Sequence, residues 1–177
     1  MRRRSVALAI AVVGIGLVVA SLAVAGEGKK NLDADALVGY HEIPDVSTVA
    51  TGSFSVAIDD AAQTLEYELS YSGLEGSVLQ AHVHFGKRGV NGGISVFLCT
   101  NLGNGPAGTP TCPQSGTVSG TLDAADVVGP GVQGIAAGEF GELAAAMRNG
   151  ATYANVHSTT WTGGEIRAQV NDDNRRD

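Results

Sequence analysis

Basic residues are scarce in this chain. Its 177 residues include 11 Lys and Arg against 18 Asp and Glu, which gives a formal net charge of −7. Nucleic-acid binding depends on clustered Lys and Arg that neutralise phosphates. We therefore expect no nucleic-acid partner. The negative charge is expected to favour solubility and to attract cations.

The sequence also lacks the short motifs of two large enzyme classes. It contains no Gly-x-Ser-x-Gly segment, so the turn that exposes the nucleophile of many hydrolases is missing. Two glycine-rich runs, Gly103–Gly108 and Gly129–Gly138, have neither the lysine nor the strand–loop–helix context of a phosphate-binding loop. These absences favour a binding or structural role over catalysis.

Cysteine is limited to two residues, Cys99 and Cys112. The segment between them is rich in glycine and proline and can bend back easily, so we expect a disulfide that stabilises the fold by about 3 kcal/mol. Disulfides persist mainly in oxidising compartments. The alternative is a pair of free or metal-binding thiols.

The N-terminus has the three parts of a secretory signal peptide. Arg2–Arg4 precede an apolar run from Val6 to Val24, and Ala23–Ala25 supplies a small-x-small cleavage site. We predict a signal peptide over residues 1–25, whose removal leaves eight basic against 18 acidic residues, a net charge of −10. An uncleaved anchor is the alternative, because the run is long enough to span a bilayer. Both imply a secreted or cell-envelope location, with membrane contact only through this segment.

The rest of the chain is long enough for one domain. We predict a flexible lead-in over residues 26–36, a folded domain over 37–170 and a disordered tail over 171–177. The domain carries short runs in which apolar and polar residues alternate between turn signals, as antiparallel strands do. The predicted strands are Leu37–Ile43, Ser53–Ile58, Thr64–Tyr71, Val78–Phe85, Ile94–Cys99, Ser115–Leu122, Ala151–His157 and Glu165–Val170.

One segment has helical spacing instead. Phe140, Leu143, Ala144 and Met147 recur at intervals of three and four residues within Glu139–Arg148. About seven to nine short strands with one short helix predict an all-β fold, either an antiparallel β-sandwich or a Greek-key barrel. The histidine-containing strands and Glu165–Val170 are each half apolar and half polar, as strands of a one-sided antiparallel sheet are.

Three of the four histidines lie in two predicted strands, Val78–Phe85 and Ala151–His157. Residues i and i+2 of a strand point the same way, so His82 and His84 share a face about 7 Å apart. His157 lies on the polar face of a strand far along the chain. If the two strands are neighbours, three neutral imidazoles can bind Cu or Zn at about 2.0–2.1 Å.

Four further polar residues are expected to support this site. Asn155 shares the face of His157, Glu165 can be a ligand or can orient a histidine, and His41 is a candidate fourth ligand. Arg167 would steer an anion if the site resembled that of copper–zinc superoxide dismutase, which is a fold-level analogy. The alternative is a hydrogen-bond network that fixes strand register without a metal.

Several segments, taken in order, resemble the CHRD domain, a module named from chordin and common in secreted bacterial proteins. The resemblance spans about Leu37 to Val170. Phe85 before Gly86, and Ala168 in place of a glycine, are mild departures. The matching segments are Gly39-Tyr40-His41-Glu42-Ile43-Pro44, Leu65-Glu66-Tyr67-Glu68-Leu69, Ala81-His82-Val83-His84, Tyr153-Ala154-Asn155-Val156-His157 and Gly164-Glu165-Ile166-Arg167-Ala168-Gln169.

The resemblance implies an all-β extracellular domain and no particular reaction. The expected function is therefore a secreted binding or structural module, whose partner would be an extracellular protein or a surface ligand. The alternative is a metal-binding protein with the three-histidine site, which in its extreme form would act like a superoxide dismutase.

Overall fold

The computed structural model describes residues 29–34 and 36–171. The predicted signal peptide and residues 172–177 of the predicted tail lie outside this part of the chain. Within it, no helix is long and apolar enough to cross a membrane. The described residues form nine strands and one α-helix: β1 (Lys30–Ala34), β2 (Leu37–Val38), β3 (Thr51–Asp59), β4 (Thr64–Ser72), β5 (Val78–Phe85), β6 (Gly93–Thr100), β7 (Gly116–Leu122), β8 (Thr152–Ser158), β9 (Ile166–Asn171) and α1 (Phe140–Arg148).

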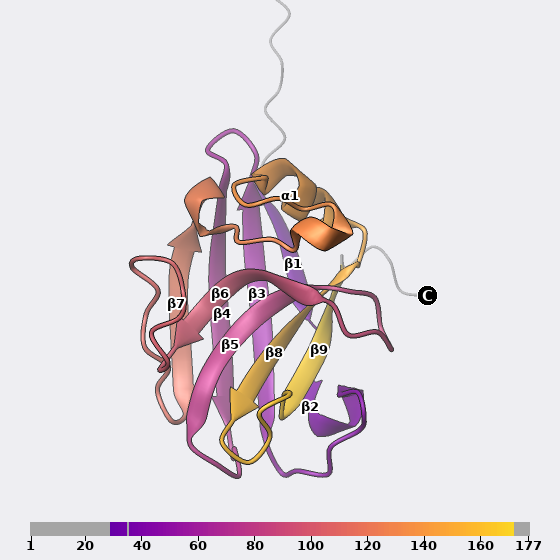
Figure 1. Cartoon of the computed structure of the whole chain (residues 1–177), viewed down its shortest axis with the longest axis vertical. Helices are drawn as coiled ribbons and strands as arrows, with labels where there is room; N and C mark the ends of the chain where they lie inside the picture. Colours follow the sequence, from indigo (N-terminus) through magenta and orange to yellow (C-terminus); the bar gives the residue numbers. More distant parts are fainter. Residues whose placement is uncertain (1–28, 35, 172–177) are drawn as a thin grey trace, which may run out of the picture.

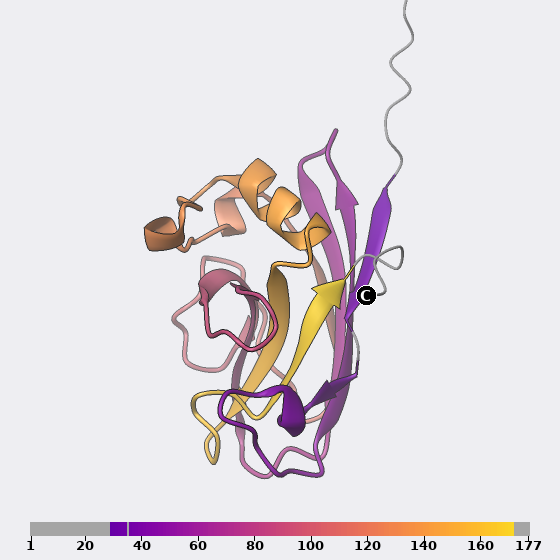
Figure 2. The ribbon, with the colours of Figure 1, turned by 90° about the vertical axis from the view of Figure 1, so that its right-hand side faces the viewer.

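All nine strands belong to one sheet with the order β6-β5-β8-β9-β1-β3-β4-β7, and the short β2 pairs with both β3 and β9. The sheet bends into two layers, with β6, β5, β8 and β9 in front of β1, β3, β4 and β7 (Figures 1 and 2). The neighbouring strands are antiparallel in every pair, from β1–β3 to β8–β9. The predicted all-β, sandwich-like fold is confirmed.

Alternating apolar side chains build the core between the layers. On β3, Phe54, Val56 and Ile58 are buried. Each such side chain contributes about 1.5–3 kcal/mol when it leaves water. Tyr67 of β4 joins the layers, because its hydroxyl donates a 2.6 Å hydrogen bond to the Leu98 carbonyl of β6.

The helix covers one end of the sandwich (Figure 1). Its buried residues include the four predicted by the spacing, which pack against the core. Glu139, predicted as the first helical residue, is the N-cap. At the other end Arg148 forms a 2.6 Å ion pair with Asp60 of the β3–β4 turn, which links the end of the helix to the back layer.

The Cys99–Cys112 disulfide is formed, as predicted, with a sulfur–sulfur distance of 2.03 Å. It ties the end of β6 to the loop that leads to β7. The amide of Thr100, the last residue of β6, donates to the Pro110 carbonyl of that loop at 2.9 Å. The bridge therefore closes a segment that also has its own hydrogen bonds.

Two sequence predictions near the N-terminus are wrong in detail. Residues 30–34 of the predicted flexible lead-in form β1, which is inserted between β3 and β9 and buries Leu32. The predicted strand Leu37–Ile43 ends at Val38. The chain then turns through a 3-10 helix, Gly39–His41, because the Gly39 carbonyl accepts from the Glu42 and Val46 amides.

Candidate metal centre

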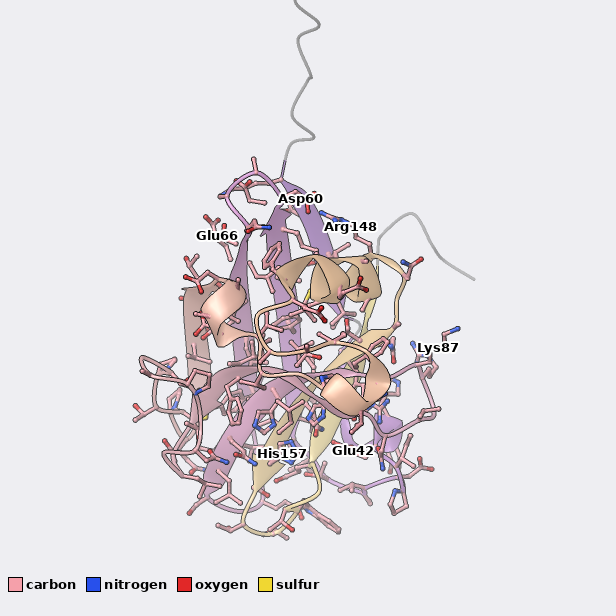
Figure 3. The ribbon with its side chains drawn as sticks, turned by 45° about the horizontal axis from the view of Figure 1, so that its top comes forward. Glu42, Asp60, Glu66, Lys87, Arg148 and His157 are labelled. Carbon is pink, nitrogen blue, oxygen red and sulfur yellow. A yellow bond between two sulfur atoms is a disulfide. The ribbon has the colours of Figure 1, made fainter. Side chains whose placement is uncertain are left out.

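The polar faces of β5, β8 and β9 are buried. His82 is 0% exposed, and Asn155 and Arg167 are each 2% exposed. The loops at residues 86–92 and 159–164 and the turn after β2 cover this face and supply hydrogen-bond partners to it. Figure 3 labels two side chains of this layer, His157 and Glu42.

Strand pairing brings the three predicted histidines together. β5 and β8 are neighbours, with His82 opposite Asn155 and Gln80 opposite His157. The ring centroids are 5.3 Å apart for His82–His84, 5.0 Å for His82–His157 and 5.9 Å for His84–His157. One nitrogen from each ring lies within 4.8 Å of the other two. The cluster thus has the size of a metal site.

Backbone carbonyls fix the tautomers of two of the rings. Nδ1 of His84 lies 3.0 Å from the Gly92 carbonyl oxygen, and Nδ1 of His157 lies 3.1 Å from the Thr162 carbonyl oxygen. A carbonyl oxygen can only accept, so each Nδ1 carries the hydrogen. Each Nε2 then carries the lone pair, which is the form in which a histidine binds a metal.

His82 is hydrogen-bonded to His157 within the cluster. Its Nδ1 lies 3.2 Å from Nε2 of His157, and because that Nε2 is an acceptor, His82 must donate. Nε2 of His82 and Nε2 of His84 are buried and have no hydrogen-bond partner. Buried polar atoms are nearly always satisfied, so two unpartnered acceptors in one cluster require an explanation.

Burial keeps these imidazoles neutral. Burial, together with smaller effects of the neighbouring His157 and His84, lowers the pKa of His82 to about 2. It lowers the pKa of His84 to about 4 and also lowers that of His157, although the backbone hydrogen bonds oppose the shift. Protons therefore do not compete for the ring nitrogens near neutral pH, which favours metal binding.

Tyr153 and Arg167 form a stack beside His84. The Tyr153 ring is parallel to the His84 ring within 3°, with centroids 4.8 Å apart. The guanidinium carbon of Arg167 lies 3.3 Å from the centre of the same tyrosine ring. Tyr153 is on β8, between β5 and β9, so its ring connects the histidine to the arginine.

Arg167, predicted to steer an anion in a site like that of superoxide dismutase, is bound to the loop between β5 and β6. It is buried, and its guanidinium donates to the Val90 carbonyl at 2.7 Å, the Lys87 carbonyl at 3.2 Å and Asn91 Oδ1 at 3.1 Å. These bonds hold the loop between β5 and β6 over the cluster. Arg167 therefore holds in place the loop that covers the histidine cluster.

Asn155 supports a buried carboxyl group that the sequence analysis missed. Its Nδ2 donates to Glu42 Oε1 and, at 3.0 Å, to the Ile166 carbonyl. Burial raises the pKa of Glu42 to about 7, although the Asn155 hydrogen bond and the charge of Arg167 oppose the shift. The available signal was the glutamate of the Gly-x-x-Glu-x-Pro segment, which falls just before the strand-breaking Pro44.

Glu165 and His41 lie outside the histidine cluster. Glu165 Oε1 accepts from Thr48 Oγ1 at 2.9 Å and from the Glu75 amide at 2.8 Å, so this carboxylate ties two loops together. Nδ1 of His41 lies 3.2 Å from the Arg167 carbonyl oxygen. Among the described residues the cluster consists of three histidines and includes neither of these two side chains.

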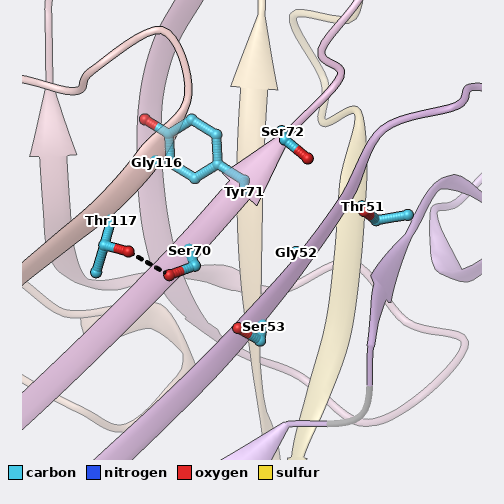
Figure 4. Close-up of a pocket in the computed structure, with 8 residues that line it drawn as sticks. All are labelled: Thr51, Gly52, Ser53, Ser70, Tyr71, Ser72, Gly116 and Thr117. Atoms are coloured by element: carbon cyan, nitrogen blue, oxygen red, sulfur yellow. Dashed lines mark hydrogen bonds between the residues drawn. The ribbon is translucent and has the colours of Figure 1, made fainter.

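A separate surface hollow lies on the back layer, away from the histidines. Its lining is dominated by small and hydroxyl-bearing residues of β3, β4 and the start of β7 (Figure 4). Ser70 and Thr117 hydrogen-bond to each other at 2.6 Å across its floor. It contains none of the predicted site residues.

The fold and the site together define an all-β, disulfide-linked domain with a buried histidine cluster. The family model of the CHRD domain matches residues 34–170, so the chain belongs to the CHRD-domain family, as its motifs predicted. This membership supports a binding or structural module and specifies no reaction. Comparisons with curated proteins and with solved structures gave no match.

Proposed function

We propose that this CHRD domain is a metal-binding module that works outside the cytosol and holds copper or zinc on His82, His84 and His157. The observation that carries the proposal is the convergence of three buried imidazoles, one nitrogen of each within 4.8 Å of the other two, with Nε2 of His84 lacking any hydrogen-bond partner. A metal ion is the partner that would satisfy such lone pairs, because neutral imidazole is a preferred ligand of both metals.

The spacing of the rings supports the same function. Ligands at about 2.0–2.1 Å from a metal in trigonal or tetrahedral geometry lie about 3.3–3.6 Å from each other. Nδ1 of His82 and Nε2 of His157 are 3.2 Å apart, so an ion could replace the shared proton with little movement of either ring. His82 would then carry its hydrogen on Nε2. The widest separation in the cluster, 4.8 Å, requires only a modest approach by His84.

An extracytoplasmic location fits two features. The Cys99–Cys112 disulfide is stable in oxidising compartments, and residues 1–25 have the pattern of a signal peptide. A module in that location would meet metal ions outside the cytosol. The partner stays a prediction: an extracellular protein or a surface ligand.

Metal analysis of protein purified without an affinity tag tests the proposal. After incubation with Cu or Zn and removal of free ions, we expect about one equivalent in the wild type. We expect less than about a tenth of that in His84→Gln and His157→Gln, because two imidazoles bind far more weakly than three. His41→Gln is the matched control and should retain the ion. No bound metal, or equal loading in all four proteins, would refute the proposal.

A hydrogen-bond network that fixes strand register is the second candidate. It is favoured by the bonds from His84 to the Gly92 carbonyl and from His157 to the Thr162 carbonyl. On this reading the same His→Gln variants lower the melting temperature of metal-free protein, and added metal changes no melting temperature. The metal-binding proposal instead requires that added metal stabilises the wild type and not the variants.

A further inference from the structure

We propose that the site selects copper as Cu(I) over Cu(II) and Zn(II). This inference rests on the proposed function and adds the identity and charge of the ion. Three independent features of the cluster carry it: the charge of its ligands, their number, and a fixed cation behind one of them.

The ligands are uncharged. The cluster contains three imidazoles, and no carboxylate or thiolate of the described residues belongs to it. Both Glu42 and Glu165 are engaged elsewhere, with Asn155 and with Thr48. An ion bound here keeps its full charge in a buried environment, and that cost rises steeply with the charge. A singly charged ion is therefore favoured over a doubly charged one.

The ligands are also few. Structural zinc sites take four tetrahedral protein ligands, zinc sites with three histidines add a water as the fourth, and Cu(II) prefers four ligands near one plane. Cu(I) has a filled d shell and is stable with three. The rings of His82 and Phe97 are nearly perpendicular, with centroids 4.5 Å apart, so an apolar side chain rather than a fourth ligand adjoins this ring. His84, the most exposed of the three, is 8% exposed.

Arg167 places a permanent positive charge behind the cluster. It lies 3.3 Å above the Tyr153 ring, which in turn stacks on His84. The guanidinium stays protonated in proteins, and repulsion between it and the bound ion doubles when the ion goes from +1 to +2. The stack thus disfavours the divalent ions without touching the metal.

Competition titrations on the wild-type protein test the inference. Cu(I) affinity is measured without oxygen against a chromophoric Cu(I) chelator. Cu(II) and Zn(II) affinities are measured against chelators of known strength at the same pH. We expect the dissociation constant for Cu(I) to be at least about tenfold below the other two.

The outcomes separate this inference from the proposed function. Tighter binding of Cu(II) or Zn(II) overturns the inference and leaves the metal-binding module in place. Failure to bind any of the three ions overturns both.

Substitution of Arg167 adds a readout that a purely structural role would not change. Arg167→Met should lower the ratio of Cu(I) to Cu(II) affinity by about tenfold, whereas Arg167→Lys, which keeps the charge, should preserve most of it. Arg148→Met removes a cation at the far end of the domain, where Arg148 pairs with Asp60, and should leave the ratio unchanged. An unchanged ratio in folded Arg167→Met contradicts the role of Arg167. If that variant does not fold, the wild-type titrations alone decide the selectivity.

Discussion

Nδ1 of His82 and Nε2 of His157 are 3.2 Å apart although 75 positions separate the two residues in the sequence. The contact exists because β5 and β8 are hydrogen-bonded neighbours in the front layer. This contact links β5, which carries His82 and His84, to the Tyr153–His157 segment of β8. Nε2 of His84, in the same cluster, has no protein partner, and the proposed metal site rests on this convergence of three imidazoles.

Acid should destabilise the metal-free domain. The buried histidines have folded-state pKa values below the unfolded value of about 6.5, at about 4 for His84 and about 2 for His82. Below pH 6.5 the unfolded chain therefore binds protons that the folded chain does not, and stability falls as pH falls. Glu42 has the opposite sign and offsets about one proton, so His82 and His84 leave a net difference of about one proton near pH 5.5, or about 1.4 kcal/mol per pH unit, and the lowered pKa of His157 increases this difference.

Urea unfolding between pH 5 and pH 7, with a chelator present, measures this slope. His84→Gln should reduce the slope by about one proton, since one titrating group is gone. Stability that is constant or that rises toward pH 5 would show that the cluster is protonated in the folded state.

Glu42→Gln should stabilise the domain at pH 8 and change little at pH 4. Burial raises the pKa of this carboxyl from 4.5 to about 7. The folded state therefore favours the protonated carboxyl. The stability that Glu42 contributes in this form is complete below pH 4.5 and is lost as pH rises through 7. Glutamine resembles the protonated form, so at pH 8 we expect a gain of about 1–3 kcal/mol.

Thermal melts of wild type and Glu42→Gln at the two pH values give the difference directly. Glu68→Gln, at an exposed position on β4, is the matched control and should have no pH-dependent effect. The effect of Glu42→Gln is compared with wild type at each pH. If the substitution were more destabilising at pH 8 than at pH 4, the ionised carboxylate would be the form that the folded state favours.

Gly164→Ala should destabilise the domain by about 2 kcal/mol or more. Gly164 has φ +132°, and an added Cβ would lie 2.6 Å from Glu42 Oε1 and 2.7 Å from Asn155 Nδ2. The substitution combines backbone strain with a clash in the polar layer. Gly163→Ala is the neighbouring control, because nothing lies within 4 Å of its added Cβ. Equal denaturant midpoints for the two variants would contradict the close packing at Gly164.

Removal of the disulfide should cost about 3 kcal/mol. The Cys99–Cys112 bridge spans 13 positions, and a loop of this size loses about that much unfolded-state entropy when it is closed. The double variant Cys99→Ala/Cys112→Ala, unfolded in urea, measures the loss. A change below about 1 kcal/mol would mean that the hydrogen bonds of the loop, such as Thr100 to Pro110, are enough to keep it folded.

Local patterns were sufficient for most of the fold. The alternation in Thr64–Tyr71 predicted β4 almost to its ends, because a strand with one face in the core repeats every two residues. The spacing of Phe140, Leu143 and Met147 predicted the buried face of α1 for the corresponding reason. The N-terminal region was harder: β1 has a single buried leucine, and its position depends on pairing with β3 and β9.

The candidate site was only partly predictable. The alternation of His82 with Val83 and of His157 with Val156 assigned each histidine to the polar side of its own strand. Alternation does not reveal which strands are neighbours, or that loops cover the polar side. For that reason the burial of Arg167, its stack on Tyr153 and the role of Glu42 did not follow from the sequence pattern.

The sequence by itself determined the strand-rich character of the domain, its membership of the CHRD family, the cysteine pair and the identity of the three histidines, because these depend on residue type and short-range spacing. Only the tertiary structure decided that the three rings meet in a buried layer with two nitrogens left unpartnered. That outcome depends on pairing between distant strands and on carbonyls from two loops, and neither is encoded in any local period.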